Sequence, residues 1–219
     1  MPLSPSSAAF FDVDRTLVGP GTMERTFVSY LIRRRYLRAP DLARYLSYLA
    51  RNLGGLDGGL VRRNKYHLRH KDPAELEGLA AECFQSEIRP RISPEGRRRV
   101  ECHRARGQLV VLLTGSLRPL AEELARELQA DLALAAELAV ESGAFSGILS
   151  KPHPYGPEKA RLVRELARER GLDLQGSFAY GDHHSDLHVL ACVGHPYAVN
   201  PHPRLRQQAV ARGWPILQF

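Results

Sequence analysis

A short apolar run that ends in two closely spaced carboxylates constrains this chain more than any other stretch. Residues 8–17 have the sequence Ala-Ala-Phe-Phe-Asp-Val-Asp-Arg-Thr-Leu. An apolar run of this length, bounded by polar residues, predicts a buried strand of a parallel sheet. Ligands of open α/β sheets bind just outside the carboxyl ends of the strands. We therefore expect Asp12 and Asp14 to lie where such folds perform their chemistry.

The two carboxylates also predict a cation site. Side chains alternate along an extended chain, so Asp12 and Asp14 are expected on the same side of the strand. Two carboxylates that converge repel each other unless a cation lies between them, and Mg²⁺ prefers oxygen ligands of this kind. Taken alone, the stretch is also compatible with an Asx-type turn after a strand.

A second apolar run ends in small polar residues that suit a phosphate group. Residues 109–113 are all Leu or Val, and Thr114-Gly115-Ser116 follow them, before a helix expected over 119–128. Backbone N–H groups, a hydroxyl group and a helix N-terminus at such a junction favour an anion. The junction therefore predicts a phosphate-binding position.

The rest of the chain divides into a helical insert and a region where helices and strands alternate. No strand-like alternation occurs from residue 22 to residue 87, and helices are expected there over 23–38, 41–53, 60–70 and 73–88. Beyond residue 93, further strands are expected at 131–137 and 177–180, with a small hairpin over 137–149. The apolar stripe from Leu42 to Leu53 is expected to form a core within the insert rather than a lipid-binding face.

Four motifs, in order along the chain, resemble those of the haloacid dehalogenase superfamily, whose members are mostly phosphatases. The first is Asp12-Val13-Asp14-Arg15-Thr16, and the second is the apolar strand that ends at Thr114. Lys159, at the start of a helix expected to run to residue 170, is similar to the third motif. Gly181-Asp182-His183-His184-Ser185-Asp186 is similar to the fourth. The C-terminal tail resembles subfamily IB, which contains phosphoserine phosphatase.

The resemblance implies an α/β fold with a Rossmann-like parallel sheet, helices on both faces and an inserted helical cap domain. The core domain is then expected to comprise residues 1–18 and 92–219, and the cap residues 19–91.

The resemblance further implies a Mg²⁺-dependent phosphatase that hydrolyses a small phosphomonoester through an aspartyl-phosphate intermediate. Asp12 matches the nucleophile and Asp14 the acid–base residue. The expected Mg²⁺ ligands are Asp12, Asp14 (through its backbone carbonyl), Asp182 and Asp186.

The phosphoryl oxygens are expected to contact Thr114, Gly115 and Lys159. Lys151, in the loop before the same helix, is an alternative to Lys159.

Two departures from the family pattern bear on the substrate. Phosphoserine phosphatases have a Glu a few residues after the first motif, where this chain has Gly21, and they have Gly-Ala-Asn where this chain has His183-His184-Ser185. We therefore expect the physiological substrate to differ from phosphoserine. His183, His184 and His188 raise zinc as an alternative, but the adjacent carboxylates favour Mg²⁺.

The charge distribution leaves other functions open. Of the formal net charge of +7, the segment 19–91 holds +6, with 14 Lys or Arg against 8 Asp or Glu. Excess positive charge attracts anionic partners of any kind. A phosphotransferase of the same fold and a non-catalytic basic module for nucleic acid or membrane are therefore alternatives. The four motifs instead favour an enzyme with a small phosphorylated substrate, no nucleic-acid partner and no stable membrane association.

Location and redox state follow from simpler features. No apolar run approaches the roughly 20 residues that span a bilayer, and the first residues lack the pattern of a signal peptide, so a cytoplasmic location is expected. Cys83, Cys102 and Cys192 are widely spaced, which favours free thiols over a disulfide framework or a zinc ribbon.

Overall fold

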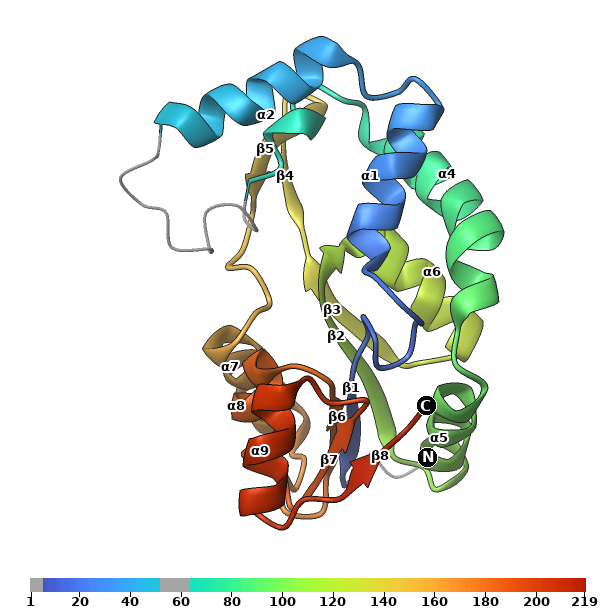
Figure 1. Cartoon of the computed structure of the whole chain (residues 1–219), viewed down its shortest axis with the longest axis vertical. Coiled ribbons are helices and arrows are strands. Elements are labelled where there is room, and N and C mark those ends of the chain that lie inside the picture. The colour runs from blue at the N-terminus through green and yellow to red at the C-terminus, as the bar shows by residue number, and fades with distance from the viewer. Residues whose placement is uncertain (1–5, 52–63) are drawn as a thin grey trace.

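A six-stranded parallel sheet forms the centre of the molecule. The computed structural model describes residues 6–51 and 64–219 (Figure 1). The sheet has the strand order β3-β2-β1-β6-β7-β8. Its strands are β1 (Ala8–Asp12), β2 (Leu109–Leu117), β3 (Leu132–Ala136), β6 (Phe178–Gly181), β7 (His195–Val199) and β8 (Ile216–Leu217). The first strand pairs in parallel with β2 on one side and β6 on the other, so the predicted α/β class with a Rossmann-like parallel sheet is confirmed.

Helices cover both faces of this sheet because β1 is apolar on both sides. Ala9 and Phe11 point into an apolar cluster that includes Leu120, whereas Ala8 and Phe10 point into a second cluster that includes Val163. Helices α5 (Pro94–Ala105) and α6 (Arg118–Leu128) cover the first face. The second face is covered by α7 (Pro157–Arg170), α8 (Leu187–Leu190) and α9 (Pro203–Ala211) (Figure 1).

The described part of the segment between β1 and α5 consists of helices joined by turns and loops. It contains α1 (Met23–Arg33), α2 (Ala39–Arg51), a 3₁₀ turn (Tyr66–Leu68) and α4 (Pro73–Cys83), which continues through a π-helical stretch (Phe84–Ile88) and a 3₁₀ turn (Arg89–Arg91). Phe27 of α1 and Leu76 of α4 share the apolar cluster that contains Leu120 of α6. The helix expected over 60–70 lies partly outside the described residues, and its described part forms only the 3₁₀ turn.

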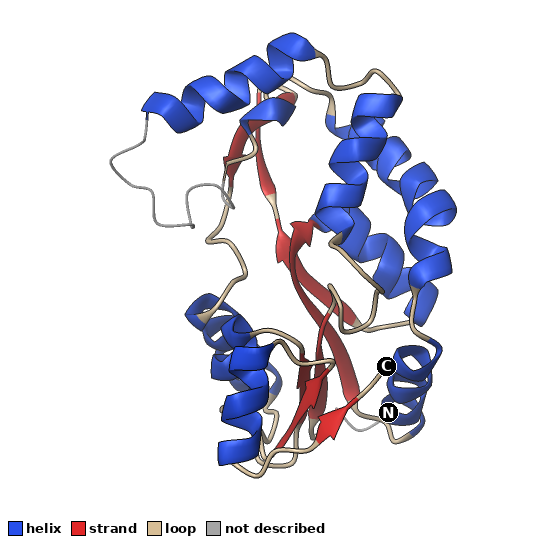
Figure 2. Cartoon of the chain, viewed as in Figure 1, coloured by secondary structure: helices blue, strands red, loops and turns tan. Residues whose placement is uncertain are grey.

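A hairpin from the second half of the chain packs against this insert. Strands β4 (Leu138–Glu141) and β5 (Ala144–Leu149) pair with each other as the predicted hairpin, and they form a sheet separate from the six-stranded one. The hairpin forms backbone hydrogen bonds with the insert: Lys65 N donates to Gly147 O over 3.2 Å, and Phe145 N donates to Lys71 O over 3.0 Å. Helix α2, residues 64–71 and this hairpin together form what we call the upper lobe, at the top of Figures 1 and 2.

The apolar stripe of α2 does not form the core that its spacing suggests. Leu42, Tyr45 and Leu49 are only half-buried, and Leu46 is 62% exposed. None of these four residues belongs to either apolar cluster, and Leu53 lies outside the described residues. The expectation of a core was wrong because Leu42 and Tyr45 instead line a cavity between the upper lobe and the sheet.

The two segments that join the insert to the sheet run side by side. Gly19 N donates to Arg91 O over 2.7 Å, and Ser93 N donates to Leu17 O over 2.8 Å. The guanidinium of Arg91 also donates to Thr26 Oγ1 over 2.8 Å. Each helix in the described part of the chain falls short of the length and apolarity needed to cross a membrane.

Candidate active site

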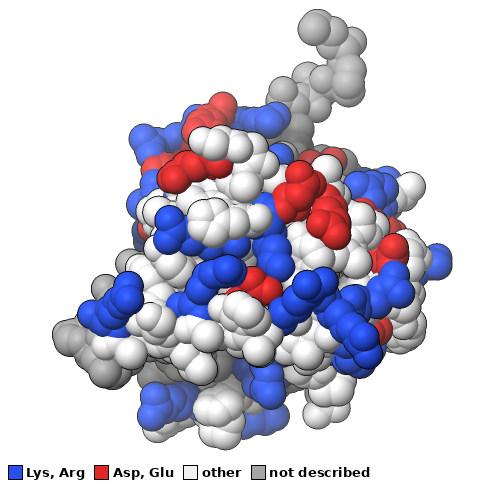
Figure 3. All heavy atoms as spheres, turned by 90° about the horizontal axis from the view of Figure 1, so that it is seen from above, with Lys and Arg blue, Asp and Glu red and all other residues white. Residues whose placement is uncertain are grey.

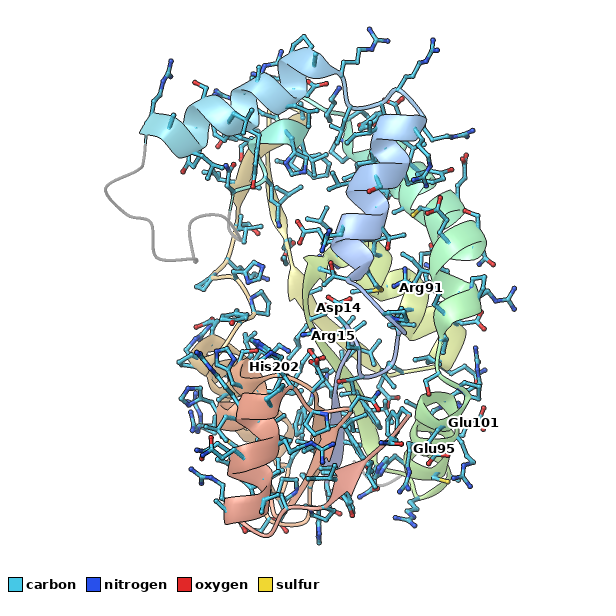
Figure 4. The ribbon with its side chains drawn as sticks, viewed as in Figure 1. Asp14, Arg15, Arg91, Glu95, Glu101 and His202 are labelled. Carbon is cyan, nitrogen blue, oxygen red and sulfur yellow. The ribbon has the colours of Figure 1, made fainter. Side chains whose placement is uncertain are left out.

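The predicted site residues surround a cavity of about 730 Å³ at the carboxyl end of the sheet. Asp12, Asp14 and Lys159 line its lower part, together with Asp182 and Asp186. Its upper wall comes from α1 and the upper lobe. Asp14 and Arg15 lie near the middle of the molecule in Figure 4, between these two parts.

Three carboxylates meet at the ends of two neighbouring strands. Asp12 is the last residue of β1, Asp182 directly follows β6, and Asp186 ends the short 3₁₀ turn His184–Asp186. Because β1 and β6 are parallel neighbours, their carboxyl ends lie together, and the three carboxylates have oxygens within 4.8 Å of one another.

This triad is suited to a hard divalent cation. Within residues 6–51 and 64–219, it is the one group of three or more acidic, His or Cys side chains close enough to share an ion, and it contains no histidine. An all-oxygen donor set fits Mg²⁺ better than zinc. The carboxylate of Asp14 is outside this group.

Lys159 lies between two of these carboxylates. Its Nζ is 2.5 Å from Asp12 Oδ1 and 2.8 Å from Asp186 Oδ1, and the side chain is buried. Burial lowers the pKa of Lys159, but the adjacent carboxylates of Asp12 and Asp186 outweigh it and hold that pKa above its usual value. Lys151 is 75% exposed and pairs instead with Glu137 at 3.1 Å. Of the two candidate lysines, only Lys159 lines the cavity.

Asp12 and Asp14 are held by different groups. Thr16 Oγ1 donates to Asp12 Oδ2 over 3.1 Å, and the amide of Met23 donates to Asp14 Oδ1 over 2.8 Å. Burial raises the pKa of both carboxyls; Lys159 opposes the shift at Asp12, and the Met23 hydrogen bond opposes it at Asp14. A carboxyl with a raised pKa is suited to donating a proton near neutral pH.

Arg15 adds a second cation to the acidic group. Its Nε lies 2.9 Å from Asp182 Oδ2, and its backbone has a φ of 65°, in the left-handed region. Burial raises the pKa of Asp182 to about 7, the charge of Asp186 adds to the shift, and Arg15 opposes it. Sequence reasoning assigned Arg15 no role.

The predicted phosphate-binding residues 114–116 lie within strand β2, whereas the sequence predicts that they follow the strand. Strand β2 continues to Leu117, and its register against β3 shifts between Leu113 and Leu117. Thr114 is 1% exposed, and its Oγ1 accepts a hydrogen bond of 3.0 Å from the amide of Ser116. Gly115 and Ser116 line the cavity, and Ser116 Oγ donates to Asp14 Oδ2 over 3.4 Å. The position of Ser116 within the second motif was the only sequence signal for it.

His153 packs against the glycine of this position. A Cβ on Gly115 would lie 2.5 Å from His153 Cε1, so only glycine allows the imidazole to stay where it is. His153 lines the cavity together with Lys65 and His67 of the upper lobe. Sequence reasoning missed all three residues, because no motif includes them and they reach the cavity through long-range packing.

Comparisons with known proteins agree with this arrangement. The sequence model of the family described as haloacid dehalogenase-like hydrolase matches residues 9–191. The chain is 35% identical to the "Inhibition of morphological differentiation protein" of Streptomyces azureus, over 98% of this chain and 79% of that protein. It is 34% identical to "Phosphoserine phosphatase SerB1" of Mycobacterium tuberculosis (strain ATCC 25618 / H37Rv), over 100% of this chain and 72% of that protein.

A solved structure of a Bordetella pertussis Tohama I protein of unknown function has a similar fold. Its TM-score is 0.83 and its sequence identity 26%, covering 97% of this chain and 98% of that one.

Proposed function

Because this chain belongs to the haloacid dehalogenase-like hydrolase family and is a phosphatase, we propose that it hydrolyses a small phosphomonoester by a Mg²⁺-dependent route through an aspartyl-phosphate on Asp12. The observation that supports this most is the position of Asp12, which lies against Lys159 and shares a triad with Asp182 and Asp186. A nucleophile, a phosphate-binding cation and a metal-binding group thus meet at one strand end.

Residues Asp12, Asp182 and Asp186 would hold the Mg²⁺ ion, with the backbone carbonyl of Asp14 as a further ligand. When bound, the ion neutralises charge on the phosphoryl oxygens.

In the first step the Asp12 carboxylate attacks phosphorus, the phosphorus–oxygen bond to the substrate alcohol breaks, and Asp14 gives its proton to the leaving oxygen. In the second step Asp14 takes a proton from a water molecule, which attacks phosphorus, and inorganic phosphate leaves Asp12. The hydrogen bonds from Met23 and Ser116 keep Asp14 oriented for both transfers. Lys159, Gly115 and Thr114 would bind the phosphoryl oxygens.

We assign the core domain to residues 1–18 and 92–219 and the cap to residues 19–91. The contacts of hairpin β4–β5 with residues 64–71 attach a core segment to this cap. A cytoplasmic location stays a prediction.

The proposed mechanism is tested by hydrolysis of p-nitrophenyl phosphate. The native chain with Mg²⁺ is compared with the same protein plus EDTA, with Asp12→Asn, and with Glu141→Gln, an exposed acid outside the cavity, as the matched control. We expect turnover to be lost with EDTA and with Asp12→Asn and retained with Glu141→Gln. Full turnover by Asp12→Asn would contradict the mechanism.

The two alternatives have distinct signatures. A phosphotransferase would form an alkyl phosphate when glycerol is added to the same assay. A basic binding module would need a surface dominated by Lys and Arg. The face seen from above instead has Asp and Glu interspersed among its Lys and Arg (Figure 3). Two arginines of the insert are also paired, Arg33 with Glu87 and Arg34 with Glu82. This mixed charge favours the enzyme.

A further inference from the structure

We propose that Lys65 and His67 of the upper lobe bind hydroxyl groups of the leaving group, so that the enzyme prefers polyol or sugar phosphates over phosphoserine. This inference rests on the proposed phosphatase function and specifies its substrate class. The phosphate-binding end of the cavity selects a phosphoryl group, whereas these two residues contact whatever lies beyond it.

Lys65 is a buried cation with spare hydrogen-bonding capacity. Its side chain is 3% exposed, and its ammonium forms an ion pair with Glu24 of α1. An ammonium has three N–H donors. Among the described residues Glu24 is its one acceptor, so two of the three donors have no protein acceptor there, and Lys65 lines the cavity.

His67 supplies a neutral partner two residues further along the chain. The residue is 7% exposed, and its Nε2 is buried with no hydrogen-bond partner in the described part of the chain. Burial lowers the pKa of His67 to about 4, and the charge of Lys65 adds to the effect, so the ring is neutral at pH 7. Tyr45 holds the ring edge-on, with the ring centroids 5.5 Å apart. A buried imidazole nitrogen without a partner costs free energy unless a ligand pairs with it.

A hydroxyl group fits this pair better than a charged group does. Lys65 and Glu24 already compensate each other, so a carboxylate that accepts from Lys65 would also lie near the Glu24 carboxylate, and an ammonium that pairs with Glu24 would also lie near Lys65. A hydroxyl can accept from Lys65 and also pair with the His67 nitrogen, because it is both donor and acceptor. The cavity of about 730 Å³ leaves room for a leaving group with several hydroxyls.

The test compares kcat/KM for four substrates with the Mg²⁺-loaded enzyme. Glycerol 3-phosphate and glucose 6-phosphate present hydroxyls, O-phosphoserine presents a zwitterion, and p-nitrophenyl phosphate presents neither. We expect both hydroxyl substrates to exceed phosphoserine by about tenfold or more. In His67→Phe, the ratio of hydroxyl-substrate to aryl-phosphate kcat/KM should fall by about tenfold or more, because the paired nitrogen is lost.

Lys65→Gln is the second variant, and the same ratio should fall there as well. Lys151→Met, an exposed lysine outside the cavity, should leave the ratio unchanged. A preference for phosphoserine, or an equal loss on all four substrates in both variants, would overturn the inference. Absence of aryl-phosphate turnover by the native enzyme would instead overturn the proposed function, and the two failures are therefore distinguishable.

Discussion

The ammonium group of Lys159 lies 2.5 Å from the Asp12 carboxylate, at the point where β1 ends. Burial raises the pKa of Asp12, and the Lys159 ammonium opposes that shift and so favours the ionised carboxylate. It also places a positive charge beside the atom proposed to attack phosphorus. The same lysine therefore supports the ionised nucleophile and is positioned to stabilise charge on the transferred group.

Replacing this lysine should impair catalysis strongly. We expect Lys159→Met to lower kcat for p-nitrophenyl phosphate on the order of 10²–10³-fold, the effect of removing a charge-stabilising group in a closed site. Lys151→Met is the matched control and should be active, because Lys151 is exposed and pairs with Glu137. Steady-state kinetics compares the two variants. An equal loss of activity in both would contradict the assignment of Lys159 to phosphate binding.

The acid–base role of Asp14 predicts a dependence on the leaving group. In Asp14→Asn the side-chain oxygen can still accept the Met23 amide, so the fold should be retained. We expect kcat to fall roughly 10²–10⁴-fold on an alkyl phosphate and less on an aryl phosphate, whose leaving oxygen needs less protonation. Circular dichroism checks the fold. An identical loss on both substrates would argue against proton donation by Asp14.

Substitution of Gly115 by alanine should lower activity, whereas substitution of Gly78 by alanine should raise stability. Gly115→Ala places a methyl group 2.5 Å from His153 Cε1, and the resulting displacement should lower kcat/KM on the order of 10²-fold. Gly78→Ala, in α4, meets nothing within 4 Å and should stabilise the protein by about 0.5–1 kcal/mol.

The double variant Gly115→Ala/His153→Ala identifies the cause of the loss. Removing the imidazole relieves the clash, so kcat/KM should recover in part relative to Gly115→Ala. If the double variant is no more active than Gly115→Ala, the clash is not the reason.

Stability should depend on pH through His67. Its folded-state pKa of about 4 lies below the ordinary value of 6.5, so below pH 6.5 the unfolded chain binds a proton that the folded protein does not. The contribution to the free energy of unfolding is therefore complete above pH 6.5 and is lost as the pH falls toward 4. By pH 5 the loss should be about 2 kcal/mol, at about 1.4 kcal/mol per pH unit.

Urea unfolding of the native protein and His67→Phe at pH 7 and pH 5 measures this term, because phenylalanine does not titrate. The free energy of unfolding of the native protein minus that of His67→Phe should be about 2 kcal/mol lower at pH 5 than at pH 7. Parallel pH dependence in the two proteins would show that His67 does not titrate as inferred.

The sequence predicted the lower part of the site well for a physical reason. Asp12 and Asp182 each lie at the end of an apolar strand, and parallel strands bring their carboxyl ends to one edge of the sheet. Local pattern could not choose between Lys159 and Lys151, because both precede or begin the same helix. Only the direction of α7 shows which one reaches Asp12.

The upper part of the site could not be predicted in the same way. Lys65 and His67 lie in a short irregular segment that follows no period, and their place depends on bonds to residues about 80 positions later. The core expected from the stripe of α2 is absent because helical spacing identifies an apolar face but does not determine whether protein or a cavity covers it. Leu42 and Tyr45 line the cavity.

The backbone pairing of residues 64–71 with hairpin β4–β5 sets a rule for chimeras between relatives. Recombination with crossovers at the paired segments near Gly19 and Arg91 would transplant the insert but leave behind the strands it is bonded to. Since one hairpin strand leads into the loop that holds His153 and then into Lys159, a mismatched hairpin would also disturb the recipient's phosphate-binding residues. A functional transplant of specificity therefore requires two grafts made together, residues 19–91 and residues 138–149.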